Sequence, residues 1–273
     1  MKTSTAATGT RAVRRLATAT LVAAAVLAGA CEPKTTPARP PTSPTPQSAK
    51  DALVASVPDG DEGTFRFTIK DYEASGSGVV DAASKGVTAS IGYKDPDLGF
   101  TMNVAFLVVG QKSWVKITFS NTAGLAGLPK LPNKWLLLDP AKLTDPESTP
   151  LTFDGPDPAN TAVLLASVVT AKKTGPGQYR GTLDLTKTTD ADVADPAGIT
   201  AMGEAAKAVP FTATVDTSGR LNAIQIQVPA AGKTRAYEYK MTYTGYGNAP
   251  KVTAPSAVES QNAPAEAYEL LNS

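Results

Sequence analysis

Apolar and polar residues alternate with a period of two along much of the chain. In the segment 64–70, Phe65, Phe67 and Ile69 fall on one face and polar residues fall on the other. This pattern is typical of antiparallel strands that have one covered and one solvated face. The alternation recurs in the segments 87–93, 115–119, 179–185, 211–215, 224–228 and 237–243.

A further segment, 100–109, is apolar in both phases near its end, which indicates a central strand. Together these segments predict one large sheet of about eight to ten strands, a size at which open sheets curl. Helices are predicted at 47–57, at 159–172 after the capping pair Asp157-Pro158, and at 198–209, with a short helical piece after Asp139-Pro140. The last stretch, 256–273, is either a loose tail or a short terminal helix docked through Tyr268, Leu270 and Leu271.

The predicted helices are few compared with the size of the predicted sheet. Either they fill the apolar face of the sheet completely, or a cavity remains between sheet and helices; the pattern alone favours a packed core. If there is a cavity, apolar residues on the strand faces would line it. The candidates are Phe67, Ile69, Ile91, Met102, Val104, Phe106, Val115, Ile117, Leu183 and Ile226.

Composition removes most enzyme classes. The 273 residues include no histidine and one cysteine, which excludes a Ser-His-Asp triad, a His-ligated metal and an intramolecular disulfide. The formal net charge of +1 argues against a nucleic-acid partner. We therefore expect neither catalysis nor a metal or other cofactor.

The N-terminal region has the features of an export signal. Lys2, Arg11, Arg14 and Arg15 precede an apolar run over 16–30, which is shorter than a spanning helix requires. An uncleaved membrane anchor is the less favoured alternative, and the arginine pair at 14 and 15 leaves both the general and the twin-arginine export routes open.

The residues around Cys31 resemble the lipobox of bacterial lipoproteins, LAGAC over 27–31, although Ala28 stands where Leu or Val is usual. The resemblance implies a signal peptide over 1–30 and a diacylglycerol on the Cys31 sulfur, so that membrane lipid is the expected partner of the chain's N-terminus. Residues 31–46 then form a lipidated, Pro/Thr-rich stalk of extended character. Cleavage leaves 22 Lys and Arg against 25 Asp and Glu, so attachment to an anionic leaflet depends on the acyl group.

Several other motifs are explained by ordinary structural roles, such as turns, linkers and core packing. Asp59–Gly63 and the carboxylates of Asp190, Asp192 and Asp195 are expected to be solvated turns rather than calcium loops. Gly76-Ser77-Gly78 indicates a bend or bulge in a strand. The loop 124–129 is a plain linker or a flap at a cavity mouth. Tyr237, Tyr239 and Tyr243 form either core packing or a cavity wall, of which core packing is preferred.

Short motifs distributed over residues 47–256 combine into a resemblance to a known family. They are Lys134–Asp139, Asp157-Pro158 with Leu164-Leu165, Tyr179–Thr186, Pro210–Thr212, Asp216–Leu221, Tyr243–Gly247 and Lys251–Pro255. Together with the lipobox and stalk, the chain resembles the actinobacterial lipoproteins of the LppX/LprAFG type (LprG-like), which have a LolA-like fold.

The resemblance implies an α+β fold in which a single strongly curved antiparallel sheet, a half-barrel, has a few helices on its concave side. It also implies a lipid-binding domain over 47–256 followed by a C-terminal tail over 257–273. The protein would be an extracytoplasmic lipoprotein that binds lipid or glycolipid between sheet and helices for transfer across the envelope, with a membrane transporter as a further partner. The alternative is an envelope interaction or sensor lipoprotein with a filled core.

Overall fold

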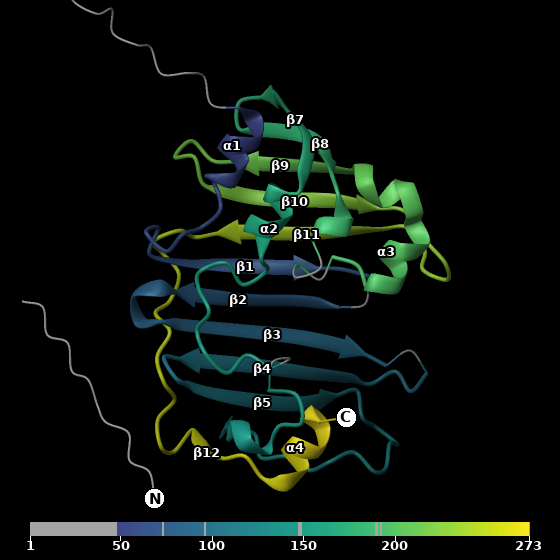
Figure 1. Cartoon of the computed structure of the whole chain (residues 1–273). Helices are drawn as coiled ribbons and strands as arrows, with labels where there is room; N and C mark the ends of the chain where they lie inside the picture. The colour runs from purple at the N-terminus through teal and green to yellow at the C-terminus, as the bar shows by residue number, and fades with distance from the viewer. Residues whose placement is uncertain are drawn as a thin grey trace, which may run out of the picture. The chain divides into compact units, whose positions relative to one another are not determined.

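The structure is a computed structural model that describes residues 48–272 except 73, 96, 147–148, 189–190 and 192. The predicted signal peptide, Cys31 and the stalk lie outside the described residues, as do Asp190 and Asp192. Within the described part, the predicted arrangement of one sheet with a few helices is confirmed (Figure 1).

The sheet is open and has the strand order β12-β6-β5-β4-β3-β2-β1-β11-β10-β9-β8-β7. Its strands are β1 (Thr64–Lys70), β2 (Ser75–Asp81), β3 (Gly86–Lys94), β4 (Thr101–Val109), β5 (Lys112–Ser120), β6 (Trp135–Leu137), β7 (Val168–Gly175), β8 (Gln178–Leu183), β9 (Val209–Val215), β10 (Leu221–Val228), β11 (Tyr237–Thr244) and β12 (Ser260–Asn262). The 12 described strands exceed the predicted eight to ten, because β6 and β12 are short, β2 has glycine at apolar positions and β7 lies in a segment predicted as helix.

The prediction of a purely antiparallel sheet is wrong at one edge, where β12 pairs with β6 in parallel. After β11 the chain crosses the sheet instead of turning back beside its neighbour. Val252 in this crossing is buried against Leu107 and Trp114. The crossing brings the chain to the far edge of the sheet, where the main-chain N–H of Trp135 donates to the Glu259 carbonyl (2.9 Å).

The helices lie on the face of the sheet turned toward the viewer in Figure 1, called here the front face; the opposite side is the back face. The α-helices are α1 (Ala49–Val54), α2 (Thr161–Ala166), α3 (Pro196–Met202) and α4 (Ala265–Leu271). Short 3-10 helices are η1 (Ala82–Ser84), η2 (Pro140–Lys142), η4 (Leu185–Lys187) and η6 (Gly203–Ala208).

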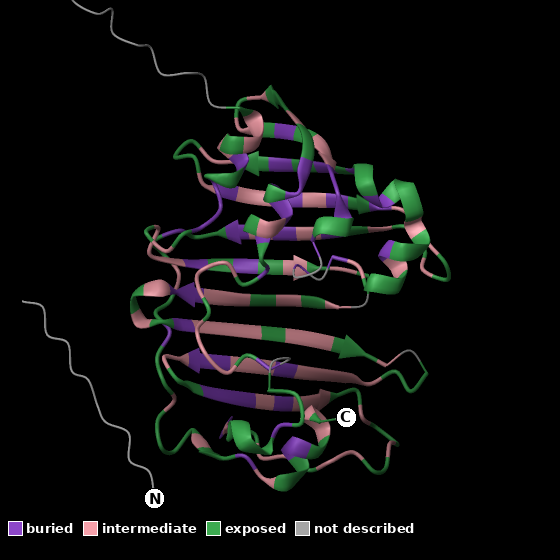
Figure 2. Cartoon of the chain, viewed as in Figure 1, coloured by how far each residue is buried: buried purple, intermediate pink, exposed green. Residues whose placement is uncertain are grey.

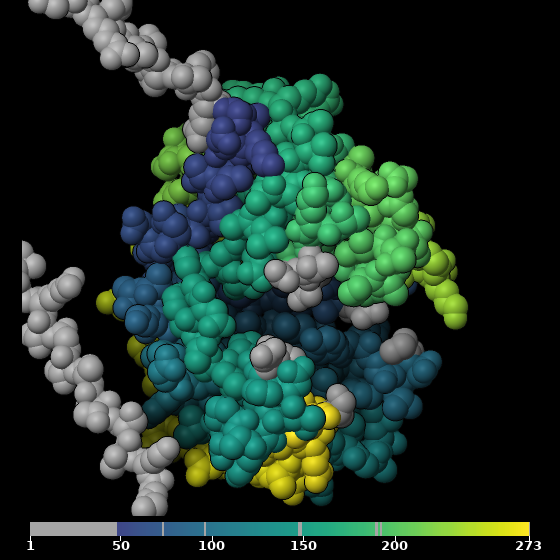
Figure 3. Space-filling model, viewed as in Figure 1, coloured from purple at the N-terminus to yellow at the C-terminus, as the bar shows by residue number. Residues whose placement is uncertain are grey.

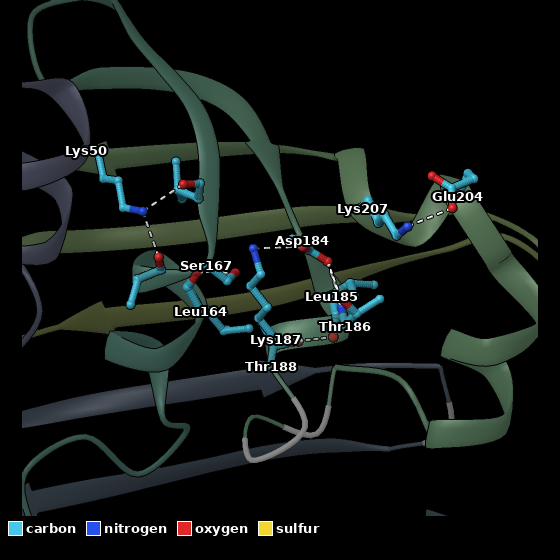
Figure 4. Close-up of polar contacts among 12 residues, drawn as sticks. Lys50, Leu164, Ser167, Asp184, Leu185, Thr186, Lys187, Thr188, Glu204 and Lys207 are labelled. Carbon is cyan, nitrogen blue, oxygen red and sulfur yellow. Dashed lines mark hydrogen bonds and ion pairs between the residues drawn. The ribbon is translucent and has the colours of Figure 1, made fainter.

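The predicted helix over 159–172 is wrong beyond its first half, because α2 ends at Ala166 and β7 begins at Val168. β-Branched residues at 168–170 favour a strand. The ammonium group of Lys50, on α1, donates to the carbonyls of Ala166 (2.7 Å) and Val168 (2.8 Å), as Figure 4 shows. These bonds satisfy carbonyls that a continuing helix would have paired with its own N–H groups.

The start of α2 also differs from the prediction. Asn160, with a φ of 48°, is the N-cap residue rather than Asp157. The Asp157 carboxylate still accepts a hydrogen bond from the main-chain N–H of Ala162 (2.8 Å). It therefore stabilises the first turn from outside the helix.

The other predicted helices are confirmed wholly or in part. The segment 47–57 contains α1, and the piece after Asp139-Pro140 is η2. The predicted helix over 198–209 is divided at Gly203, where a φ of 56° ends α3 before η6 begins. At the C-terminus the helical alternative holds: α4 packs on the sheet, and the Tyr268 hydroxyl accepts the N–H of Asp139 (2.8 Å).

The structure also describes the glycine motif at 76–78 and two of the acidic positions. Gly76 and Gly78 lie in a strand, β2, as predicted, but their pairing with both neighbouring strands continues without a register shift, so the strand has no bulge there. Asp59–Gly63 forms a turn in which the Glu62 carboxylate accepts the N–H of Gly60 (3.1 Å). Asp195 is the N-cap of α3.

The tyrosines of β11 belong to the core. Tyr239 and Tyr243 have 0% exposure, as core packing predicts. The Tyr243 hydroxyl is 2.6 Å from the Thr161 hydroxyl and donates to Asp157 (3.1 Å). Burial, together with the nearby Asp157 charge, raises the pKa of Tyr243 well above its usual value, so the phenol stays neutral and ties α2 to the sheet.

A buried carboxylate holds the crossing segment on the back face. The Asp81 carboxylate accepts the main-chain N–H groups of Val252 (3.1 Å) and Ser84 (3.3 Å). Burial by itself raises the pKa of Asp81, but these hydrogen bonds and the charge of Lys251 lower it further than burial raises it. The net pKa lies below the ordinary 3.8.

The Asp81→Asn variant should lower the free energy of unfolding by about 1–3 kcal/mol at neutral pH, because it removes a buried charged acceptor. Because the pKa of Asp81 is lower in the folded state than in the unfolded state, the ionised carboxylate stabilises the fold at neutral pH. This contribution to stability is lost as the pH falls below 3.8 and passes through the folded-state pKa. Urea denaturation at pH 7 and pH 3 measures both effects. The exposed Asp97→Asn is the control; an equal loss for the two variants, or a loss for Asp81→Asn that is unchanged at pH 3, would contradict this account.

Candidate functional site

The buried apolar residues on the front face form two separate clusters. The first cluster, under α1, α2 and α3, contains Phe65 and Leu164; the second, under α4, contains Val115 and Leu136. Figure 2 shows that β2, β3 and β4 between them are mostly of intermediate exposure or exposed. The middle of the apolar face is therefore only partly covered.

Strand register places eight of the ten predicted cavity residues in three rows, two of which cross β1 to β5 and one of which crosses β3 to β5. The first row is Phe67, Gly78, Ala89, Phe106 and Val115. The second row is Ile69, Gly76, Ile91, Val104 and Ile117. The third row is Tyr93, Met102 and Phe119. These three rows, called here the apolar floor, are continuous along the hydrogen-bonding direction of the sheet.

Two glycines of β2 leave room on the apolar floor for side chains of the neighbouring strands. A Cβ added at Gly78 would lie 2.5 Å from the Phe67 ring and 1.9 Å from the Thr88 carbonyl oxygen. At Gly76 it would lie 3.0 Å from Ile69 and 3.3 Å from Ile91. The larger side chains of β1 and β3 thus lie over β2, which supplies no side chain of its own at these two positions.

One end of the apolar floor is bridged by the chain segment 149–156. Leu151 packs on the second cluster and Phe153 on the first. The Ser113 hydroxyl, on β5, donates to the Pro150 carbonyl (2.6 Å) and fixes the segment at this end of the strands. Figure 3 shows the surface hollowed beside this segment, with the central strands at the bottom.

The other end of the apolar floor is open and more polar. Tyr93 is 42% exposed there. Burial of its ring, together with the charge of Asp71, raises the pKa of Tyr93, so its hydroxyl is a neutral donor. The result is a groove with an apolar bottom and a phenol at its mouth.

Eight of the ten predicted cavity residues lie on the apolar floor: Phe67, Ile69, Ile91, Met102, Val104, Phe106, Val115 and Ile117. Ile69, Ile91, Met102 and Phe106 are partly exposed, whereas the other four are buried. Leu183 and Ile226 lie elsewhere, in the first cluster, with 0% exposure. The structure therefore places these two in closed core beneath the helices and not in the groove.

Some residues of the groove were not predicted from the sequence. Gly76 and Gly78 shape its floor, while Leu151 and Phe153 bridge its end. In β2, glycine occupies inward positions that are apolar in the other strands. Glycine and polar residues alternating with a period of two is a signal that could have identified this strand. No local signal identifies the segment 149–156.

The groove is suited to burying apolar matter rather than to acid–base chemistry. Its floor is made of Ile, Val, Met and Phe side chains.

Among the described residues no group of three or more His, Cys, Asp or Glu side chains could hold a metal ion. No helix within the described ranges is long and apolar enough to cross a membrane.

Comparison with known proteins adds little. No family model matches the chain, and no curated protein matches it. Among solved structures, a porin-like protein from Bacteroides uniformis is similar at 12% identity, over 69% of this chain and 98% of that chain, with a TM-score of 0.19. A likeness at this level carries no argument about fold or function.

The Gly78→Ala variant should destabilise the protein by about 1–3 kcal/mol, because the new methyl group meets main chain and a packed ring. Thermal or urea unfolding measures the loss. The matched control is Gly92→Ala on β3, where the added Cβ would meet the Asn103 side chain at 3.1 Å rather than main chain. Equal stability of the two variants would contradict the close approach of Phe67 and the β3 main chain to Gly78.

Proposed function

We propose that the protein is an extracytoplasmic lipoprotein, anchored by an acylated Cys31, whose front-face groove binds the acyl chain of a lipid or glycolipid. We further propose that its fold is LolA-like and that it belongs with the LppX/LprAFG-type lipoproteins, consistent with the motifs and the open single sheet. Delivery of the lipid across the envelope, with a membrane transporter as partner, is the role that such binding would serve.

The observation that carries this proposal is the partly exposed apolar floor between two closed clusters. Ile69 packs at the margin of the first cluster, and Met102 and Phe106 pack at the margin of the second. Apolar surface left between two packed regions favours occupation by an apolar ligand, since each buried methylene gains about 0.8 kcal/mol. Ten methylenes would supply about 8 kcal/mol before the costs of association are subtracted.

The polarity of the two ends suggests how a lipid would lie. The segment 149–156 bridges one end through Leu151 and Phe153, which is suited to the end of an acyl chain. The open end has the Tyr93 hydroxyl, which can donate a hydrogen bond to an ester or phosphate oxygen. A headgroup would therefore lie at the solvent-exposed mouth.

The Ile91→Gln variant tests the site, because Ile91 is on the apolar floor in β3. Full-length protein is incubated with a membrane lipid extract, and bound lipid is measured by native mass spectrometry. Loss of the apolar contact should reduce lipid affinity about tenfold or more. Ser90→Gln, on the opposite face of the same strand, should leave lipid binding unchanged.

Absence of bound lipid from the unmodified protein would contradict the proposal. It would favour the alternative of an envelope interaction or sensor module. Equal binding by Ile91→Gln and Ser90→Gln would show that any bound lipid lies outside the front-face groove.

A further inference from the structure

The back face of the sheet carries a second groove, which crosses β1 to β4. Its bottom is the main chain at Phe67, Gly78, Ala89 and Phe106, whose row faces the front. Its volume is about 500 Å³. Because the apolar floor and this groove lie on opposite sides of the same strands, a ligand in one need not contact a ligand in the other.

The walls of the back-face groove are rich in hydroxyl groups. One wall includes Thr68, Ser77 and Ser90, and the other includes Thr244 and Thr88. The hydroxyl groups of Ser77, Ser90 and Thr244 make no hydrogen bond to any residue that the structure describes. They are available as both donors and acceptors.

A cation and an aromatic ring complete the lining. Arg66 is exposed, lies on the same wall as Thr244, and forms no ion pair with a described residue. Trp135 lies at the β6 end of the groove and packs against the buried Leu107 and Trp114 cluster. The indole is therefore held by its neighbours while it lines the groove.

Positive charge is concentrated on this face. The register places Lys172 directly opposite Arg180, and Lys70 directly opposite Lys240. Like charges directly opposite on neighbouring strands repel, and none of the four is in an ion pair within the described residues. Glu238 is the one exposed carboxylate at a back-face strand position in the described ranges. This face is thus complementary to a polyanion.

We propose that the back-face groove binds an acidic oligosaccharide. Ser and Thr hydroxyls would bond the sugar hydroxyls, Arg66 would pair with a carboxylate or other anionic substituent, and the Trp135 ring would pack on a sugar face. The cations at Lys70 and Lys240 border the same rows of side chains and would attract the chain. This proposal is independent of lipid binding on the front face.

An anionic bilayer is the less favoured occupant. Membrane-binding surfaces insert apolar side chains beside their cations. The walls of this groove instead combine five Ser and Thr side chains with Val79, Ala105 and Trp135, and its bottom is recessed main chain that a flat bilayer would not reach. Sugar rings in an extended chain can enter such a groove.

The test is isothermal titration of full-length protein in detergent micelles with tetragalacturonate, with the neutral maltotetraose of equal length as comparison. Tetragalacturonate should bind, and binding should weaken as salt rises. Arg66→Gln should weaken it about tenfold or more, since one charge-assisted hydrogen bond is lost. The matched control Arg235→Gln, in the loop between β10 and β11, removes the same charge elsewhere and should leave affinity unchanged.

Trp135→Phe supplies a second readout, because Trp114, the other tryptophan, is 5% exposed. Tetragalacturonate should change the fluorescence of the unmodified protein but leave that of Trp135→Phe unchanged. The proposal is overturned if tetragalacturonate does not bind, if maltotetraose binds equally well, or if Arg66→Gln and Arg235→Gln behave alike. Arg66-dependent binding to phosphatidylglycerol vesicles without tetragalacturonate binding would overturn it in favour of a membrane.

Discussion

The shape of the front face depends on β2, a central strand that lacks side chains at two of its inward positions. Phe67, Ile69 and Ile91 lean over Gly76 and Gly78 because no Cβ opposes them. The first cluster includes Val80 of β2 and reaches the partly buried Val87 and Ala89 of β3, whereas the second cluster begins at β4, so neither cluster closes over Ile91. A branched residue at Gly78 could not be accommodated without moving the main chain of β3 or the Phe67 ring. The two glycines therefore shape the floor of the groove, while the helices leave its middle uncovered.

Long-range polar contacts then fix the elements that cover the two clusters. Lys50 joins α1 to the end of α2, and Tyr243 joins α2 to β11 through Thr161 and Asp157. On the other side, Asp81 holds the crossing segment through Val252. Each contact joins residues that are far apart in the sequence, so the covers are positioned by tertiary contacts and not by their neighbours in the chain.

The alternation of side chains made the strands predictable, because the period of two is a local property of each segment. It also allowed eight of the ten predicted cavity residues to be identified as neighbours on one face, since each was chosen at an apolar strand position. Leu183 and Ile226 have the same local pattern but lie beneath helices. The sequence between 159 and 172 was misread because its helix ends where Lys50, 116 residues away from Ala166, supplies the capping bonds.

By itself, the sequence determined that the protein is built on one large sheet with a solvated face, that it contains no histidine, and that its lone cysteine follows basic residues and an apolar run. These conclusions rest on composition and on periodicities within short segments. Only the tertiary structure decided which apolar faces are sealed, where the open groove lies, and how the cations gather on the opposite side. The physical reason is that strand order and register bring together residues from distant segments, and no local pattern records which strands become neighbours.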